Sequence, residues 1–118
     1  MTDTITIYHN PRCSKSRETL ALLESNGVAP TIVEYLKNPP SVSQLKQLLK
    51  ALGFADARQL MRTKEECYKT LNLGETTLTQ EQLIQAMHEN PKLIERPIVV
   101  KGKQAKLGRP PEQVLELL

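Results

Sequence analysis

Aromatic residues are scarce in this 118-residue chain, which has no tryptophan, one phenylalanine and three tyrosines. So few aromatic side chains do not favour the base-stacking platform of a protein that binds single-stranded nucleic acid. The formal net charge is only +3, and no basic run reaches five residues. We therefore expect no nucleic-acid partner, and the small basic surplus suits an anionic small molecule at least as well.

Long apolar runs are also absent. No segment approaches the roughly 20 apolar residues that a membrane helix needs, so no membrane contact is expected. The opening stretch MTDTITIYHN has neither a basic region nor a long apolar one, which predicts no signal peptide. Cysteine is scarce too, since Cys13 and Cys67 are the only two. Without an export signal, both are expected to be reduced thiols in a cytoplasm.

The hydrophobic pattern predicts the order β-α-β, a helical block, a β-hairpin and a final helix. A chain of this length is the size of one domain and can bury a core without disulfides or a metal. The expected strands are 4–9, 31–36, 98–100 and 104–107, and the expected helices are 14–26, 41–53, 56–61, 63–71, 79–90 and one from Pro110. The apolar side of the helix at 79–90 is expected to hold Leu83, Ile84 and Met87, and that of the last helix Val114, Leu115 and Leu118. Three capping boxes are predicted, at Ser41/Gln44, Thr63/Glu66 and Thr79/Gln82.

Cys13 lies in the loop between the first strand and the first helix, within HNPRCSKSR. The first N–H groups of a helix have no intrahelical partner, and together with the helix dipole they favour negative charge. A cysteine there is expected to have a lowered pKa. The Ser16 hydroxyl can donate to the sulfur, and His9 adds positive potential. The same amides can hold an oxyanion, which predicts attack by the sulfur on its central atom.

Spacing excludes other classes of thiol site. Ser16 stands where a C-x-x-C pair needs its second cysteine, so the dithiol cycle of thioredoxin is not available. A cysteine phosphatase loop needs an arginine where this chain has Thr19. The two cysteines and two histidines are too scattered for zinc, and no metal is expected. Cys67 lies beside Tyr68 and four residues before Leu71, which favours core packing over a resolving-thiol role.

Taken together, the motifs make the chain resemble the ArsC arsenate reductase family, in its glutaredoxin-coupled, thioredoxin-like branch. The matching stretches are IYHNPRCSKSRETL at 7–20, YLKNPPS at 35–41, LMRTKE at 60–65, NPKLIERPIVV at 90–100 and LGRPPEQVL at 107–115. They keep the order of the family, and the likeness is greatest to a short bacterial branch. The resemblance implies an α/β, thioredoxin-like fold with a mixed four-stranded sheet. It implies one domain over 1–118, with an all-helical insertion at about 41–90.

The resemblance also implies an active site. Its residues are the catalytic Cys13, the oxyanion-binding arginines Arg62, Arg96 and Arg109, and the supporting His9, Ser16 and Pro97. His9 and Ser16 match residues that favour the thiolate, and Pro97 matches a cis-proline that faces the active cysteine. Guanidinium groups bind tetrahedral oxyanions bidentately and stay charged, which suits arsenate.

The implied activity is arsenate reduction, as in arsenic resistance. The Cys13 thiolate would attack arsenate, and glutathione with glutaredoxin would complete the reduction to arsenite, with no bound cofactor. Two alternatives stay open because a fold does not fix a function. One is a non-enzymatic partner-binding protein like the Spx-type regulators, which bind RNA polymerase. The other is a thiol-disulfide oxidoreductase that acts on glutathione mixed disulfides.

Overall fold

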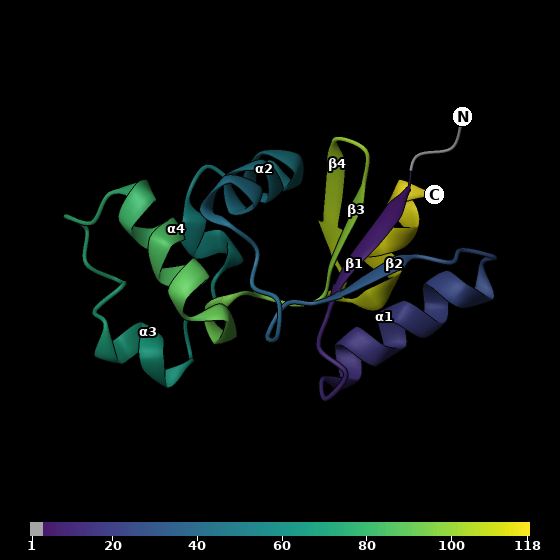
Figure 1. Ribbon diagram of the computed structural model, residues 1–118, viewed down its shortest axis with the longest axis horizontal. Helices are drawn as coiled ribbons and strands as arrows, with labels where there is room; N and C mark the ends of the chain where they lie inside the picture. Colours follow the sequence, from purple (N-terminus) through teal and green to yellow (C-terminus); the bar gives the residue numbers. More distant parts are fainter. Residues whose placement is uncertain (1–3) are drawn as a thin grey trace. The chain divides into compact units, whose positions relative to one another are not determined.

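The computed structural model describes residues 4–118, which form two compact units (Figure 1). The sheet unit contains the described residues up to Asn38 together with Arg96–Leu118. The helical unit is Pro39–Glu95, and the helical segment predicted at 41–90 falls inside it. No helix among the described residues is long and apolar enough to cross a membrane.

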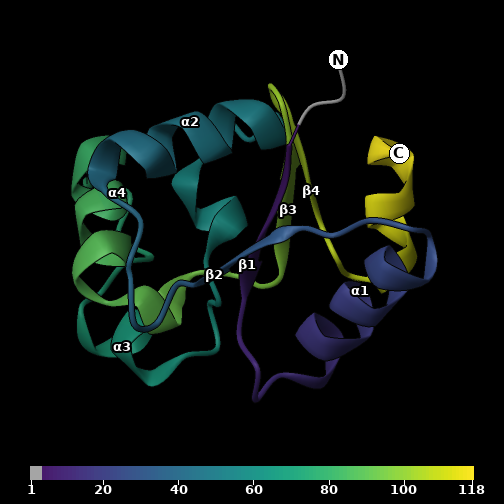
Figure 2. The same ribbon diagram turned by 45° about the vertical axis from the view of Figure 1, so that its right-hand side comes forward.

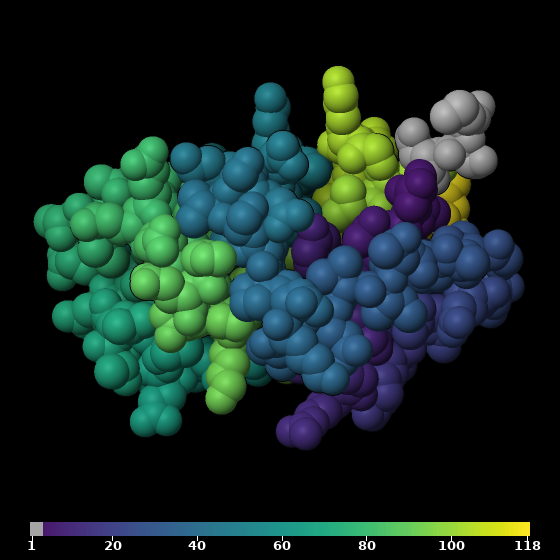
Figure 3. Space-filling model, viewed as in Figure 1, coloured from purple at the N-terminus to yellow at the C-terminus, as the bar shows by residue number. Residues whose placement is uncertain are grey.

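The sheet unit is built on four strands in the order β2-β1-β3-β4. The strands are β1 (Ile5–His9), β2 (Thr31–Glu34), β3 (Ile98–Lys101) and β4 (Gln104–Leu107). β1 pairs with β2 in parallel and with β3 antiparallel, which confirms the predicted mixed sheet. This is a thioredoxin-like α/β arrangement. The edge strand β2, blue in the space-filling view, lies at the surface (Figure 3) and ends two residues before the predicted limit at Leu36.

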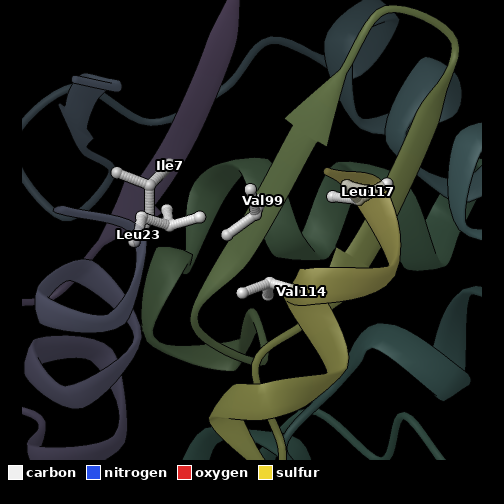
Figure 4. Packing of buried hydrophobic residues seen from close by; sticks show 5 residues of the cluster. All are labelled: Ile7, Leu23, Val99, Val114 and Leu117. Carbon is white, nitrogen blue, oxygen red and sulfur yellow. The ribbon is translucent and has the colours of Figure 1, made fainter. Parts of the chain in front are cut away.

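Two helices cover one face of this sheet (Figure 2). They are α1 (Ser14–Ser25) and the 3-10 helix η3 (Pro111–Leu117). Figure 4 shows the apolar cluster that joins them, which consists of Ile7 and Val99 from the sheet, Leu23 from α1, and Val114 and Leu117 from η3. All five are buried, and each buried aliphatic side chain stabilises the unit by roughly 1.5–3 kcal/mol. This packing holds the C-terminal half of α1 against the sheet.

The last helix differs from the prediction. Pro110 precedes the helix as its N-cap, and the helix is of the 3-10 type. A 3-10 helix has three residues per turn, so side chains three positions apart align. Val114 and Leu117 are therefore the buried pair, whereas Leu115 and Leu118, which we expected on the apolar side, are exposed.

The helical unit contains five helical segments. They are α2 (Val42–Leu52), η1 (Ala57–Leu60), α3 (Glu66–Thr70), α4 (Gln80–Glu89) and η2 (Pro91–Leu93). The capping boxes predicted at Ser41 and Thr79 are both present, and Gly53 ends α2 in the left-handed conformation. α4 packs on α2, and its predicted apolar residues Leu83, Ile84 and Met87 are buried.

The third predicted capping box, at Thr63 with Glu66, is wrong. The chain forms an isolated β-bridge between Met61 and Ile94, and Glu65 N–H then donates to Arg62 C=O at 3.0 Å. That turn delays the helix, so α3 begins at Glu66 and ends at Thr70 with no side-chain cap. α3 buries none of its residues. The prediction that Cys67 packs in the core is therefore also wrong.

Candidate active site

Hydrogen bonds within the loop at 10–13 hold Cys13 at the start of α1. Its N–H donates to Asn10 C=O at 3.0 Å, and its own C=O accepts from Arg17 N–H at 3.0 Å. The Asn10 side-chain Oδ1 also accepts the Arg12 N–H, at 3.0 Å. Cys13 is the N-cap of α1 in an extended conformation, with φ −93° and ψ 124°. The thiol thus sits where the unpaired N–H groups of a 12-residue helix begin.

The electrostatic surroundings of the Cys13 sulfur favour the thiolate. The side chain is buried, at 9% exposure, which by itself would raise its pKa. The backbone N–H of Ser16 and the Arg96 guanidinium outweigh burial, with help from the Lys15 N–H, so the net pKa is lowered. Both N–H groups belong to the first turn of α1, where they have no partner within the helix.

His9 and Ser16 form a buried pair beside the loop. The Ser16 Oγ lies 2.6 Å from His9 Nδ1 and accepts the Asn10 N–H at 3.0 Å. Burial lowers the pKa of His9, although the Glu34 charge opposes this, so the ring is favoured in its neutral form. We expected the Ser16 hydroxyl to donate to the sulfur. Instead the hydroxyl engages His9 and Asn10, and Ser16 lowers the Cys13 pKa through its backbone N–H.

The β3–β4 hairpin brings two of the predicted arginines together. The ladder pairs Ile98 with Leu107, and the hydrogen bond from Gly108 N–H to Pro97 C=O, at 3.0 Å, extends it by one residue. The same register places Arg96 opposite Arg109, and Arg109 Nε donates to Arg96 C=O at 2.8 Å. Arg109 Nη2 then lies 3.8 Å from the Cys13 sulfur. The Arg96–Pro97 bond is cis, as the resemblance implied.

Gly108 marks a close approach between the hairpin and α1. A Cβ at this position would overlap Thr19 Oγ1 and would lie 2.7 Å from Pro97 Cγ. Thr19 is fully buried, and its hydroxyl donates to Lys15 C=O at 2.8 Å. Only glycine therefore fits between the helix that carries Cys13 and the cis-proline.

The third predicted arginine, Arg62, belongs to the helical unit. Its N–H donates to Leu93 C=O at 2.7 Å, and its guanidinium Nη1 lies 2.9 Å from Glu65 Oε2. Arg62 is not on a helix, because it follows the Met61–Ile94 bridge and opens the turn before α3. Its action on the same oxyanion as Arg96 and Arg109 stays a prediction.

The remaining arginines have other environments. Arg58 fastens η1 to the loop after α3, donating from Nε to Leu73 C=O at 2.8 Å and from Nη2 to Glu75 C=O at 2.6 Å. Arg17 donates to Pro11 C=O at 3.2 Å, and Arg12 is exposed. Among residues 4–118, no three His, Cys, Asp or Glu side chains cluster in a way that could hold a metal ion.

Comparison with known proteins identifies the family. The model of the ArsC family matches residues 8–117. The chain belongs to the ArsC family. It is 60% identical to the uncharacterized protein YfgD of Escherichia coli, over all of this chain and 99% of that one. It is 57% identical to an arsenate reductase of Haemophilus influenzae, over 97% of this chain and 98% of that one. A solved arsenate reductase of Vibrio cholerae is 58% identical, covers both chains completely and superposes with a TM-score of 0.97.

Three residues of this ArsC-family site escaped sequence reasoning. Asn10 shapes the cysteine loop, and Thr19 with Gly108 sets the distance between α1 and the hairpin. The Asn10-Pro11 pair is a local turn signal, and it is the feature of the sequence that could have marked this loop. Nothing in the sequence marks Thr19, because its packing against Gly108 joins segments 89 positions apart.

Proposed function

We propose that this protein is an arsenate reductase in which Cys13 is the nucleophile and glutathione, with glutaredoxin, supplies the second thiol. The observation that carries the proposal is a thiol of lowered pKa at a helix start, with the Arg109 guanidinium 3.8 Å from its sulfur. Relatives named arsenate reductase, 46% to 57% identical over nearly the whole chain, support the choice of arsenate. We place the reaction in the cytoplasm, where thiols are kept reduced.

The first step is attack of the Cys13 thiolate on arsenic. An S–As bond forms, and one As–O bond breaks as its oxygen leaves as water after protonation. Arsenate carries about two negative charges near neutral pH and would repel a thiolate, because like charges at short range disfavour each other. Arg96 and Arg109 neutralise that charge, and Arg62 is proposed to add a third guanidinium. Their planar forks match pairs of tetrahedral oxygens.

The second step needs another thiol, since reducing As(V) to As(III) takes two electrons and a single thiol cannot form a disulfide. The sheet unit holds no cysteine besides Cys13. A glutathione thiolate therefore attacks the Cys13 sulfur, and the electron pair of the S–As bond stays on arsenic. Arsenite leaves, and a Cys13–glutathione disulfide remains. A glutaredoxin thiol exchanges with that disulfide and returns Cys13 to its thiol form.

The test is a coupled assay of the purified protein with arsenate, glutathione and glutaredoxin, in which arsenite is measured directly. We expect repeated turnover only when both glutathione and glutaredoxin are present, and with glutathione alone no more than one arsenite per protein molecule. Repeated turnover with thioredoxin in place of glutaredoxin would contradict the proposed donor. If the protein reduces glutathione mixed disulfides without arsenate and forms no arsenite under any condition, it is a thiol-disulfide oxidoreductase. Capture of RNA polymerase by an inactive protein would favour a regulator.

A further inference from the structure

Glu65 holds the guanidinium of Arg62. The two side chains meet at 2.9 Å, between Nη1 and Oε2, and they are only 33% and 25% exposed. The backbone fixes both residues as well, because Glu65 N–H donates to Arg62 C=O at 3.0 Å, and Arg62 N–H donates to Leu93 C=O at 2.7 Å. The ion pair is therefore formed within one tight turn, and the backbone already holds the two residues close together.

The Glu65 carboxylate competes with an oxyanion for the N–H groups of Arg62 Nη1. Carboxylate oxygens and the oxygens of a tetrahedral oxyanion both accept from the guanidinium fork. A carboxylate and an oxyanion cannot both accept a full hydrogen bond from the same N–H group. At that distance the two anions also repel each other. The pair also has no net charge, so Arg62 attracts a dianion less strongly while Glu65 is bound to it.

Glu65 also lines a hollow, which leaves its side chain space to move. Its volume is about 380 Å³, and its lining includes Cys67, Asn90 and Lys92 besides Glu65 itself. Lys92 brings a positive charge to the lining of the same hollow. The Glu65 carboxylate can therefore move into this hollow when it releases Arg62.

We propose that Glu65 is an internal competing anion, which a tetrahedral oxyanion displaces from Nη1 of Arg62 when it binds the guanidinium fork. Glu65 then sets the affinity for dianions such as arsenate and phosphate, without taking part in the chemistry at sulfur. This rests on the proposed function, which assigns Arg62 to the oxyanion. Glu65 is a positioning residue that acts only through Arg62.

The test compares Glu65→Gln with Glu66→Gln in the full chain. Glutamine keeps the shape of glutamate but removes its charge, and Glu66 is the exposed neighbour that lines the same hollow. Glu65→Gln is expected to lower KM for arsenate about threefold to fivefold, the size of a partly exposed ion pair, and to leave kcat unchanged. Glu66→Gln is expected to leave both constants unchanged. In an Arg62→Gln background, Glu65→Gln should have little further effect.

A second readout separates this proposal from the proposed function. Phosphate should protect Cys13 from alkylation by iodoacetamide at lower concentrations in Glu65→Gln than in the unmodified protein, and this requires no turnover. A protein that forms no arsenite but shows this shift would overturn only the proposed activity. An unchanged or raised KM in Glu65→Gln, an equal fall in Glu66→Gln, or no protection by phosphate at all would overturn the competing-anion role.

Discussion

Each of the two cysteines lies near the start of a helix, yet their surroundings differ. Cys13 caps the 12-residue α1, and its sulfur faces Arg109, with Arg96 lowering its pKa. Cys67 is the second residue of the five-residue α3 and lines a hollow with Glu65 and Glu66. The difference lies in the charges that distant segments bring to each thiol.

The most severe test of this difference between the two cysteines is to remove each thiol in turn. Cys13→Ser is expected to reduce arsenate turnover by at least about 1,000-fold, because the nucleophile is lost. Cys67→Ser should retain nearly all of the activity, since a glutathione thiol takes the place of a second protein cysteine. Initial rates of arsenite formation measure both. Similar losses in the two variants would require Cys67 in the catalytic cycle.

A weaker perturbation removes the cation rather than the sulfur. Arg96→Gln is expected to lower kcat/KM for arsenate by about 10-fold to 100-fold, as charge-assisted hydrogen bonds to the oxyanion are lost. It should also raise the Cys13 pKa, because the Arg96 guanidinium favours the thiolate. Arg12→Gln is the matched control, since Arg12 is exposed one residue before the cysteine. An equal loss in Arg12→Gln would mean that only the total charge matters.

A third perturbation, which leaves every charge in place, concerns the packing behind the cysteine helix. Gly108→Ala places a methyl group against Thr19 and Pro97, which should cost about 1–3 kcal/mol of the free energy of unfolding. Gly74→Ala is the control in the helical unit, where the added Cβ meets Tyr68 Oη at an ordinary 3.5 Å. Urea unfolding measures both variants. If Gly108→Ala were as stable as Gly74→Ala, the close approach would not constrain the site.

Much of the fold follows from local signals in the sequence. The capping boxes at Ser41 and Thr79 are complete in themselves, and the structure has both. The one at Thr63 fails because the Met61–Ile94 bridge, a contact over 33 positions, constrains the chain just before it. At these three positions, the local pattern predicted the cap correctly where no distant contact intervened.

The residues of the site also differ in whether local signals in the sequence predict them. The thiolate character of Cys13 follows from its place before a helix, and the structure lowers its pKa as expected. The pairing of Arg96 with Arg109 could also be predicted from the sequence. A two-residue turn at Gly102 and Lys103 sets the hairpin register, which places these arginines opposite each other. Arg62 has no such local signal, and only the family resemblance selected it from six arginines.

The most direct test of the contrast between the thiols is their rate of alkylation against pH. Mass spectrometry after brief exposure to iodoacetamide, with and without arsenate, follows Cys13 and Cys67 in one sample. Because the Cys13 pKa is lowered, its rate should rise and level off with a midpoint below the roughly 8.5 of a free thiol. Arsenate should slow the alkylation of Cys13 and leave the alkylation rate of Cys67 unchanged. A Cys13 midpoint at or above that of a free thiol, with no protection by arsenate, would contradict the account.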